Sequence, residues 1–298
     1  MQQPNLIGHL QKIQAAVTGQ GKWVLGLVIL LMPVNWGIEA RKWQLSLRSL
    51  HSITYRQAFR AILSGVSFSL NTPNRIGEYG GRILFLPEGK RGRAVSLTIA
   101  ASFSQLLITL TMGSAGLFLI SERLLAEGSN SNLRIWITVF RSVVVFFACT
   151  GFLLYFRMTW LLKGIGLVPG IRKLLPYISV LEDMDFKVLL RVLVLSGVRF
   201  LVFLIQYNLM LQLMDVQTGW WTGLWTVSVL FLLLATLPTV ALLELGLRWE
   251  YSVMLFSPYS GNTVGILASA TGIWLINLVL PAIIGSLFIL GIRIFREP

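Results

Sequence analysis

Two segments of the sequence place a glutamate and an arginine four positions apart, in the pattern Glu-x-Gly-x-Arg. The pattern occupies residues 78–82 and 244–248, and each copy follows a proline, Pro73 in the first and Pro238 in the second. An arginine guanidinium binds phosphate and carboxylate groups through planar, charge-assisted hydrogen bonds, and a carboxylate tuned by burial can exchange a proton. The chemistry available to these segments is therefore the binding of a polar or charged group.

The chain around these pairs has the composition of a membrane protein. Hydrophobic residues make up 55% of the 298 residues and charged residues 12%, about half of the roughly 25% charged residues found in soluble domains. Several apolar runs approach or exceed the roughly 20 residues that cross a bilayer. The net charge of +13 falls in short segments between these runs, which fits the positive-inside rule and anionic lipid headgroups better than nucleic acid.

The apolar runs divide into full-length and short ones. The predicted full-length crossings cover residues 23–38, 94–120, 135–156, 188–214 and 264–292. Residues 1–21 have apolar residues at helical spacing and are predicted to form an interfacial helix ahead of a single transmembrane domain at 22–298. Because basic segments face the cytoplasm, we expect a multi-pass protein of the cell (inner) membrane with a cytoplasmic C-terminus.

The short apolar stretches carry the two Glu-x-Gly-x-Arg copies. Residues 55–86 lie between two basic segments, 39–60 and 82–93, so both ends are expected on the cytoplasmic side, as in a re-entrant hairpin. Residues 220–256 have flanks almost free of Lys and Arg and are predicted to open to the outside. The predicted fold is an all-α polytopic membrane protein, an inverted-repeat bundle with two re-entrant, broken helix hairpins whose tips meet near the membrane midplane.

The polar residues of the hairpins have two interpretations. Since Glu precedes Arg by four residues in both copies, each pair could be an ion pair on a helix that only helps the hairpin to insert. The functional interpretation rests on the cost of ionisable groups in membrane segments, which mark functional paths by default. On that interpretation, the candidate substrate-binding residues are Asn71, Arg75, Glu78, Arg82, Arg199, Glu244 and Arg248. The candidate hinge residues are Pro73, Gly80, Gly81, Pro238 and Gly246.

Other polar residues in the apolar runs give weaker signals. Arg199 lies near the middle of its run and is predicted to face inward, either toward a ligand or toward a hairpin glutamate. Asn35 and Glu39 stand at the end of the first run and are interpreted as packing or interfacial residues. Asn277 and Pro281 predict a hydrogen bond between helices and a kink, respectively.

The sequence offers little for a metal or a cofactor. It has one cysteine, Cys149, and two histidines, His9 and His51, which are too few for a His/Cys metal site. It also has no nucleotide-binding motif. We therefore expect no metal and no cofactor. If the protein transports a substrate, we expect that transport to be passive or ion-coupled.

Four segments carry a resemblance to a known family. They read EARKWQLSL, TPNRIGEYGGR, LPTVALLELGLR and WLINLVLPAIIG, in this order along the chain. In these segments the chain resembles the transmembrane region of the lysylphosphatidylglycerol synthase family, also called flippase-like integral membrane proteins. The resemblance implies a bacterial or archaeal membrane protein that moves a lipid between leaflets; some members carry a lysyl-transferring domain, for which this sequence shows no counterpart.

The leading functional hypothesis is a lipid translocator without enzymatic activity. Its substrate would be an anionic or aminoacylated phospholipid or an isoprenoid-linked lipid, bound by the arginines through its phosphate and balanced by Glu78 and Glu244. The first alternative is a membrane-embedded headgroup transferase that uses these two glutamates as acid and base. The second is a non-transporting partner subunit of a separately encoded lipid-modifying enzyme.

Overall fold

The computed structural model describes residues 19, 21–70, 72–124, 131–157, 175–237 and 239–294. Within these ranges the chain forms helices and no strand, which confirms the predicted all-α class. The interfacial helix predicted at 1–21 falls almost entirely outside the described residues, and Asn71 and Pro238 also lie outside them.

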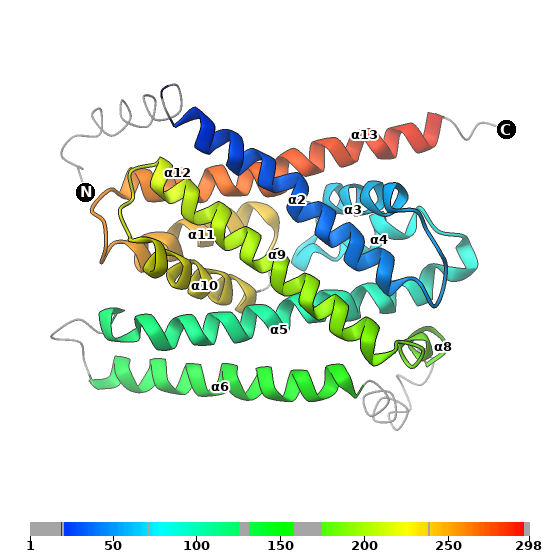
Figure 1. The fold of residues 1–298 in the computed structure, drawn as a ribbon, viewed down its shortest axis with the longest axis horizontal. Coiled ribbons are helices and arrows are strands. Elements are labelled where there is room, and N and C mark those ends of the chain that lie inside the picture. Colours follow the sequence, from blue (N-terminus) through cyan, green and yellow to red (C-terminus); the bar gives the residue numbers. More distant parts are fainter. Residues whose placement is uncertain are drawn as a thin grey trace. The chain divides into compact units, whose positions relative to one another are not determined.

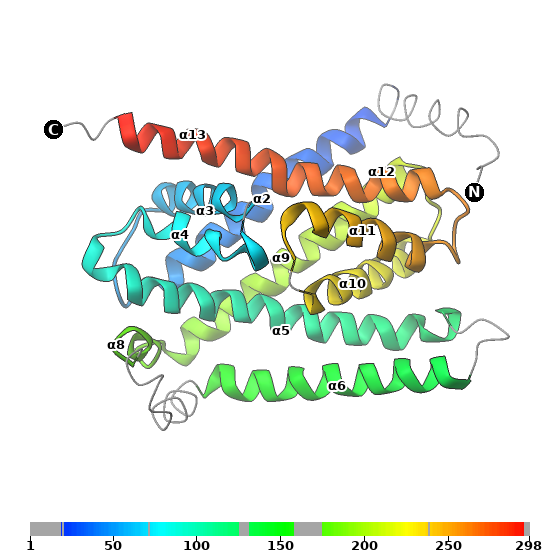
Figure 2. The ribbon, with the colours of Figure 1, turned by 180° about the vertical axis from the view of Figure 1, so that it is seen from behind.

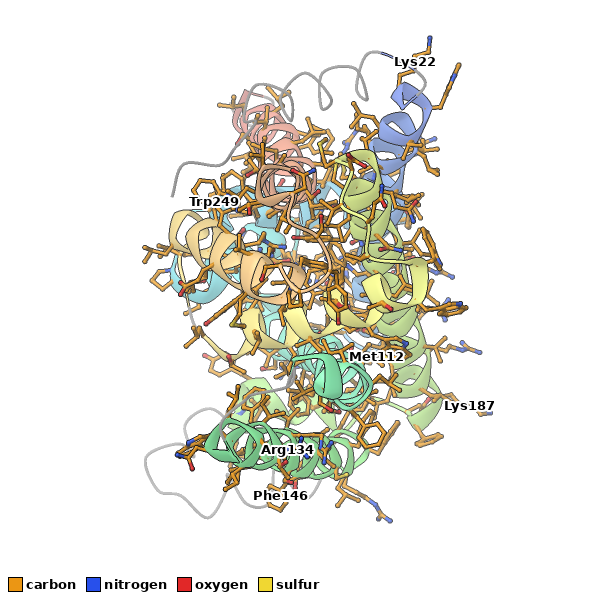
Figure 3. The ribbon with its side chains drawn as sticks, turned by 90° about the vertical axis from the view of Figure 1, so that its left-hand side faces the viewer. Lys22, Met112, Arg134, Phe146, Lys187 and Trp249 are labelled. Carbon is orange, nitrogen blue, oxygen red and sulfur yellow. The ribbon has the colours of Figure 1, made fainter. Side chains whose placement is uncertain are left out.

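Among the described residues, five helices are long and apolar enough to cross a membrane, and they coincide with the five predicted crossings. They are α2 (Lys22–Ser46), α5 (Arg91–Leu124), α6 (Ser131–Phe156), α9 (Phe186–Leu213) and the continuous run of α12 (Thr263–Trp274), η5 (Leu275–Val279) and α13 (Leu280–Ile294) (Figure 1). Large apolar side chains project from them, such as the exposed Phe146 on α6 (Figure 3). These helices make the chain a membrane-embedded protein.

Helix α2 is longer than the apolar run that predicted it. The run ends at residue 38, but the helix continues for two more turns to Ser46. Glu39 and Lys42 are therefore helical residues and do not belong to a loop.

The two short apolar stretches each form a pair of helices. The first pair is α3 (Tyr55–Ser69) and α4 (Gly77–Ile83), separated by the short η1 (Pro73–Arg75). The second pair is α10 (Trp220–Thr236) and α11 (Ala241–Phe256). The remaining short helical segments are η2 (Glu88–Lys90), α8 (Leu175–Ile178) and η4 (Ser179–Leu181). In the first pair, Pro73 lies in the segment between the two helices and begins η1; a proline removes a helical backbone hydrogen bond.

The chain divides into two compact units. Unit 1 contains Met1–Val34, Thr109–Val145 and Leu201–Val279, and unit 2 contains Asn35–Ile108, Phe146–Phe200 and Leu280–Pro298. Unit 1 includes the pair α10–α11, and unit 2 includes the pair α3–α4. Each unit thus has one pair of short helices, one Glu-x-Gly-x-Arg copy and parts of the long helices.

In unit 2, small residues bring α3 close to its neighbours. Figure 2 shows α3 beside α4 and α13, both of which it contacts. A Cβ atom added to Gly81 of α4 would lie 2.5 Å from the Cα of Gly65 on α3, and one added to Gly285 of α13 would overlap the carbonyl oxygen of Leu63. Such close backbone approach is typical of small-residue packing between membrane helices.

Buried hydrogen bonds join the long helices of unit 2. The indole Nε1 of Trp43 on α2 donates to Oγ1 of Thr98 on α5 over 2.9 Å. The hydroxyls of Ser104 on α5 and Ser196 on α9 lie 2.7 Å apart. These side chains are buried, so their hydrogen bonds fix α2 and α9 against α5.

In unit 1, Asn277 joins two helices as the sequence predicted. Its Nδ2 donates to Oε1 of Gln206 on α9 over 2.9 Å, and Gln206 Nε2 donates to the carbonyl oxygen of Val28 on α2 over 2.7 Å. Asn277 lies in η5, a π-helical turn just before Pro281. A proline removes a helical backbone hydrogen bond, and a π-helical turn is one way in which a long helix accommodates such a break.

Candidate functional site

The carboxylate of Glu39 is the centre of a buried cluster of charges in unit 2. Its Oε2 lies 2.8 Å from Nζ of Lys42 and 3.2 Å from Nη1 of Arg199, and its Oε1 accepts a hydrogen bond from Nη2 of Arg82 over 3.0 Å. The three cations come from α2, α9 and α4. One carboxylate thus pairs with cations on three helices.

Arg82 also pairs with Glu78, one turn earlier on α4. The same nitrogen, Nη2, serves both Glu39 and Glu78. The other nitrogens of the guanidinium, Nε and Nη1, are buried and have no hydrogen-bond acceptor among the residues that the structure describes. A buried donor without an acceptor costs about 1–3 kcal/mol, so Arg82 is incompletely satisfied by its protein neighbours.

Arg199 has a partner that the sequence did not predict. It forms an ion pair with Glu39, in addition to an electrostatic interaction with Glu78, whereas the sequence suggested either a ligand or a hairpin glutamate. Its Nε donates to Oδ1 of Asn35 over 2.9 Å, and its guanidinium lies 5.0 Å from the ring centre of Trp36, a distance typical of a cation–π contact. Asn35 and Glu39, interpreted above as packing or interfacial residues, therefore belong to the site.

We call this set of side chains the charge cluster; it consists of Glu39, Lys42, Glu78, Arg82 and Arg199. Three cations face two carboxylates, which leaves one positive charge in excess. Exposure is 2% for Glu39, 0% for Lys42 and 2% for Arg82. Buried charges are tolerated in a membrane protein when they are paired or line a polar path.

Arg75 lies at the turn between α3 and α4 and adds positive charge near the cluster. It interacts electrostatically with Arg199. Its backbone is in the left-handed region with a φ of 56°, which is unusual for a residue other than glycine. Such a conformation persists only where the surrounding structure requires it, so the turn is held in a defined shape.

Glycines set the position of α4 in the site. A Cβ atom on Gly65 would lie 3.0 Å from Cγ of Arg82 and 3.2 Å from Cγ of Glu78. Only a residue without a side chain allows α3 to cover these two residues so closely. Gly65 was not among the predicted site residues, although it lies on the predicted hairpin.

The predicted hinge residues fall in different places. Gly80 and Gly81 lie inside α4, and Gly246 lies inside α11. Pro73 begins η1 at the break after α3. Gly81 makes the close contact with α3, whereas an added Cβ atom would meet nothing within 4 Å at Gly80 or Gly246.

The second Glu-x-Gly-x-Arg copy forms a local pair in unit 1. Nη2 of Arg248 lies 2.8 Å from Oε1 of Glu244 on α11. Arg248 is buried and interacts electrostatically with Tyr207, whose hydroxyl lies 3.0 Å from Oγ of Ser252. The predicted pairing of glutamate with arginine is therefore present in both copies.

In the described part of the chain, no three His, Cys, Asp or Glu side chains are grouped so that they could hold a metal ion. Comparison of the sequence and the structure with protein-family models, curated proteins and solved structures gives no match.

Proposed function

We propose that this protein moves a lipid with a polar headgroup between the two leaflets of a membrane. The observation that carries the proposal is the charge cluster, which brings together five ionisable side chains from two membrane-crossing helices and α4; three of them, Glu39, Lys42 and Arg82, are buried. Charges at such a position are costly and are retained mainly for function. Arginine and lysine side chains match the phosphate that most membrane lipids carry in their headgroups.

The helix pairs support this proposal through their lengths. Helices α3, α4, α10 and α11 contain 15, 7, 17 and 16 residues, all fewer than the roughly 20 residues that cross a bilayer. A short pair whose two ends lie on the same side of the membrane is a re-entrant hairpin. We propose this topology for both pairs, with the α3–α4 pair entering from the cytoplasmic side.

The division of the chain supports an inverted repeat. Each unit combines one helix pair, one Glu-x-Gly-x-Arg ion pair and parts of the long helices. In transporters with inverted repeats, broken helices of this kind carry the substrate site. Each helix pair is therefore a candidate substrate-binding element of its own unit, in line with the resemblance to flippase-like membrane proteins.

A leaflet-exchange assay tests the proposal. The purified protein is reconstituted into vesicles whose lipids carry a fluorescent label, and a membrane-impermeant quencher reports how fast label from the inner leaflet reaches the outer one. We expect exchange faster than in protein-free vesicles, and we expect Arg82→Gln to remove the gain. Exchange at the protein-free rate for every labelled lipid would contradict the proposal and favour a partner subunit or an enzyme.

A further inference from the structure

We infer that the half of α6 that begins at Ser131 carries a binding site for a membrane phospholipid, in which Arg141 binds the lipid phosphate. The residues of this site belong to unit 1, whereas the charge cluster belongs to unit 2. The inference goes beyond the proposed function, because a phospholipid can be held at this site whether or not the protein moves lipids between leaflets.

Arg141 lies well inside the membrane-crossing helix α6. It is the eleventh residue of this 26-residue helix, so its Cα lies about 15 Å along the helix axis from Ser131, in a helix about 39 Å long. A bilayer with its headgroup regions is about 40–45 Å thick, so α6 crosses nearly all of it. An ionisable side chain inside such a segment is costly and is a candidate functional residue.

Arg141 contacts an aromatic ring and pairs with no carboxylate among the described residues. Its guanidinium carbon lies 5.2 Å from the ring centre of Phe118 on α5, and Phe118 is exposed. The ring attracts the cation, but it does not supply the oxygen acceptors that the five N–H donors of a guanidinium require. Arg141, which is half-exposed, is therefore held at the surface of unit 1 with donors left for a ligand.

The face of α6 around Arg141 changes from charged to apolar along the helix. Arg134, Thr138, Arg141 and Val145 follow one another at spacings of four, three and four, which puts them on one side of the helix. Arg134, Thr138 and Val145 are exposed, and the Thr138 hydroxyl donates to the carbonyl oxygen of Arg134 over 2.9 Å. The face has cations toward Ser131 and an apolar side chain beyond them, which is the order of phosphate and acyl chain in a phospholipid.

The direction of the side chain favours a lipid as the ligand. Side chains on a helix lean toward its N-terminus, so Arg141 leans toward the membrane surface on the side of Ser131. Arginine side chains reach toward headgroups in this way, and the bilayer thins locally around them. A guanidinium can then bind a phosphate through two parallel hydrogen bonds.

Charge argues against a second copy of the chain on this face. Two such faces would bring Arg134 and Arg141 of one copy against the same cations of the other, and like charges in contact are unfavourable. A phospholipid brings the opposite charge and an acyl chain together.

Capture of a lipid beside Arg141 in the purified full-length protein tests the inference. Val145 is replaced by the photoreactive residue benzoylphenylalanine, the protein is stripped of lipid in detergent, and phosphatidylglycerol or diacylglycerol with the same acyl chains is titrated before illumination. Mass spectrometry of the intact protein measures the lipid adduct. We expect half-maximal capture at an about tenfold lower concentration of phosphatidylglycerol, since only this lipid has a phosphate and hydrogen bonds to charged groups have effects of this size.

Variants of Arg141 assign the preference to its guanidinium. Arg141→Gln should abolish the preference for phosphatidylglycerol, whereas Arg141→Lys keeps the charge without the planar fork and should retain part of it. Arg191→Gln is the matched control, because Arg191 is an exposed cation on another membrane-crossing helix, α9, and it should leave the preference unchanged. If Arg141→Gln does not fold, Arg141→Lys and the comparison of the two lipids decide.

Two results in detergent would overturn the inference: equal capture of both lipids by the protein with Arg141, or a full preference in Arg141→Gln. Illumination of native membranes adds a second test. A phospholipid adduct at position 145 supports the inference, and an adduct with another protein in its place would overturn it in favour of an acidic partner helix. Capture with the expected preference by a protein that exchanges no lipid would remove the proposed function alone.

Discussion

Glu39 holds three cations from three helices with a single carboxylate, and this makes it the residue on which the site depends most. Arg82 and Glu39 are 43 positions apart in the sequence, and Arg199 is farther still. When a partner is removed from a buried ion pair, the charge that remains is left without compensation, and this cost exceeds the value of the pair itself. Loss of Glu39 would remove the ion pairs of Lys42 and Arg199 with this carboxylate, whereas Arg82 would keep its ion pair with Glu78.

Glu39→Gln should therefore reduce the free energy of unfolding by about 3–5 kcal/mol. Glu78→Gln should reduce the free energy of unfolding by less. The Glu78 side chain is more exposed, at 18%, and its partner Arg82 would still have its ion pair with Glu39. Thermal or denaturant unfolding of both variants in the same detergent measures the difference. Equal losses for the two variants would show that Glu39 is not the shared partner of the three cations.

At the residue scale the sequence predicted the local contacts and missed the distant ones. Spacing of four on a helix was enough to predict the pairs Glu78–Arg82 and Glu244–Arg248. The contact of Glu39 with Arg82 depends on how α2 packs against α4, which no local pattern encodes. The helical spacing of Trp36, Glu39 and Lys42 indicates that these residues lie on one side of a helix. This pattern can be recognised in the sequence only if the helix is predicted to extend past its apolar run.

At the scale of elements, α4 is held against α3 by glycine contacts. The position of α4 determines whether Arg82 reaches Glu39. A side chain at Gly81 would meet the backbone of Gly65, and a backbone cannot move aside as a flexible side chain can. The contact therefore links helix packing directly to the geometry of the charge cluster.

Gly81→Ala should lower the free energy of unfolding by about 1–3 kcal/mol through overpacking, and it should slow lipid exchange because Arg82 moves away from Glu39. Gly80→Ala is the adjacent control, since its added Cβ meets nothing within 4 Å, and alanine is about 0.5–1 kcal/mol better than glycine inside a helix. Unfolding measurements on both variants compare the two. Similar destabilisation by both substitutions would contradict the role of the Gly65–Gly81 contact.

The topology of the α3–α4 pair gives a second prediction at this scale. Ser49 and Gly89 lie on either side of the pair and are both exposed, so in a re-entrant hairpin both belong to the same side of the membrane. Cysteines introduced at these positions in a Cys149→Ser background should react with an impermeant thiol reagent from the cytoplasmic side. If one of them reacts only from outside, the pair is an ordinary crossing.

The long helices were predictable because the bilayer imposes a minimum length of apolar sequence on every crossing helix. All five appear where the apolar runs lie. The end of α2 was not predictable in this way, because Glu39 and Lys42 interrupt the run. They neutralise each other one turn apart on the helix, so the helix continues where hydropathy indicated a loop.

At the scale of the whole molecule, the two Glu-x-Gly-x-Arg copies differ in their surroundings. Glu244 and Arg248 form a local pair in unit 1, whereas Glu78 and Arg82 belong to a larger cluster in unit 2. Exchanging Glu78 and Arg82 would place a carboxylate beside Glu39, so it would disturb the cluster as well as the pair. Exchanging Glu244 and Arg248 keeps both charges on α11 and is the better test of whether position matters.

The most direct test of lipid translocation by this protein is the rate at which labelled phosphatidylglycerol exchanges between the leaflets of vesicles. This rate is measured for the wild type, for Arg82→Gln and for the protein with Glu244 and Arg248 exchanged. Each protein is first shown to be inserted and monodisperse. The proposed translocation path predicts fast exchange by the wild type and exchange near the protein-free rate for both variants, because each removes a charge from its place along the path. Wild-type rates in both folded variants, or a wild type no faster than protein-free vesicles, would contradict it.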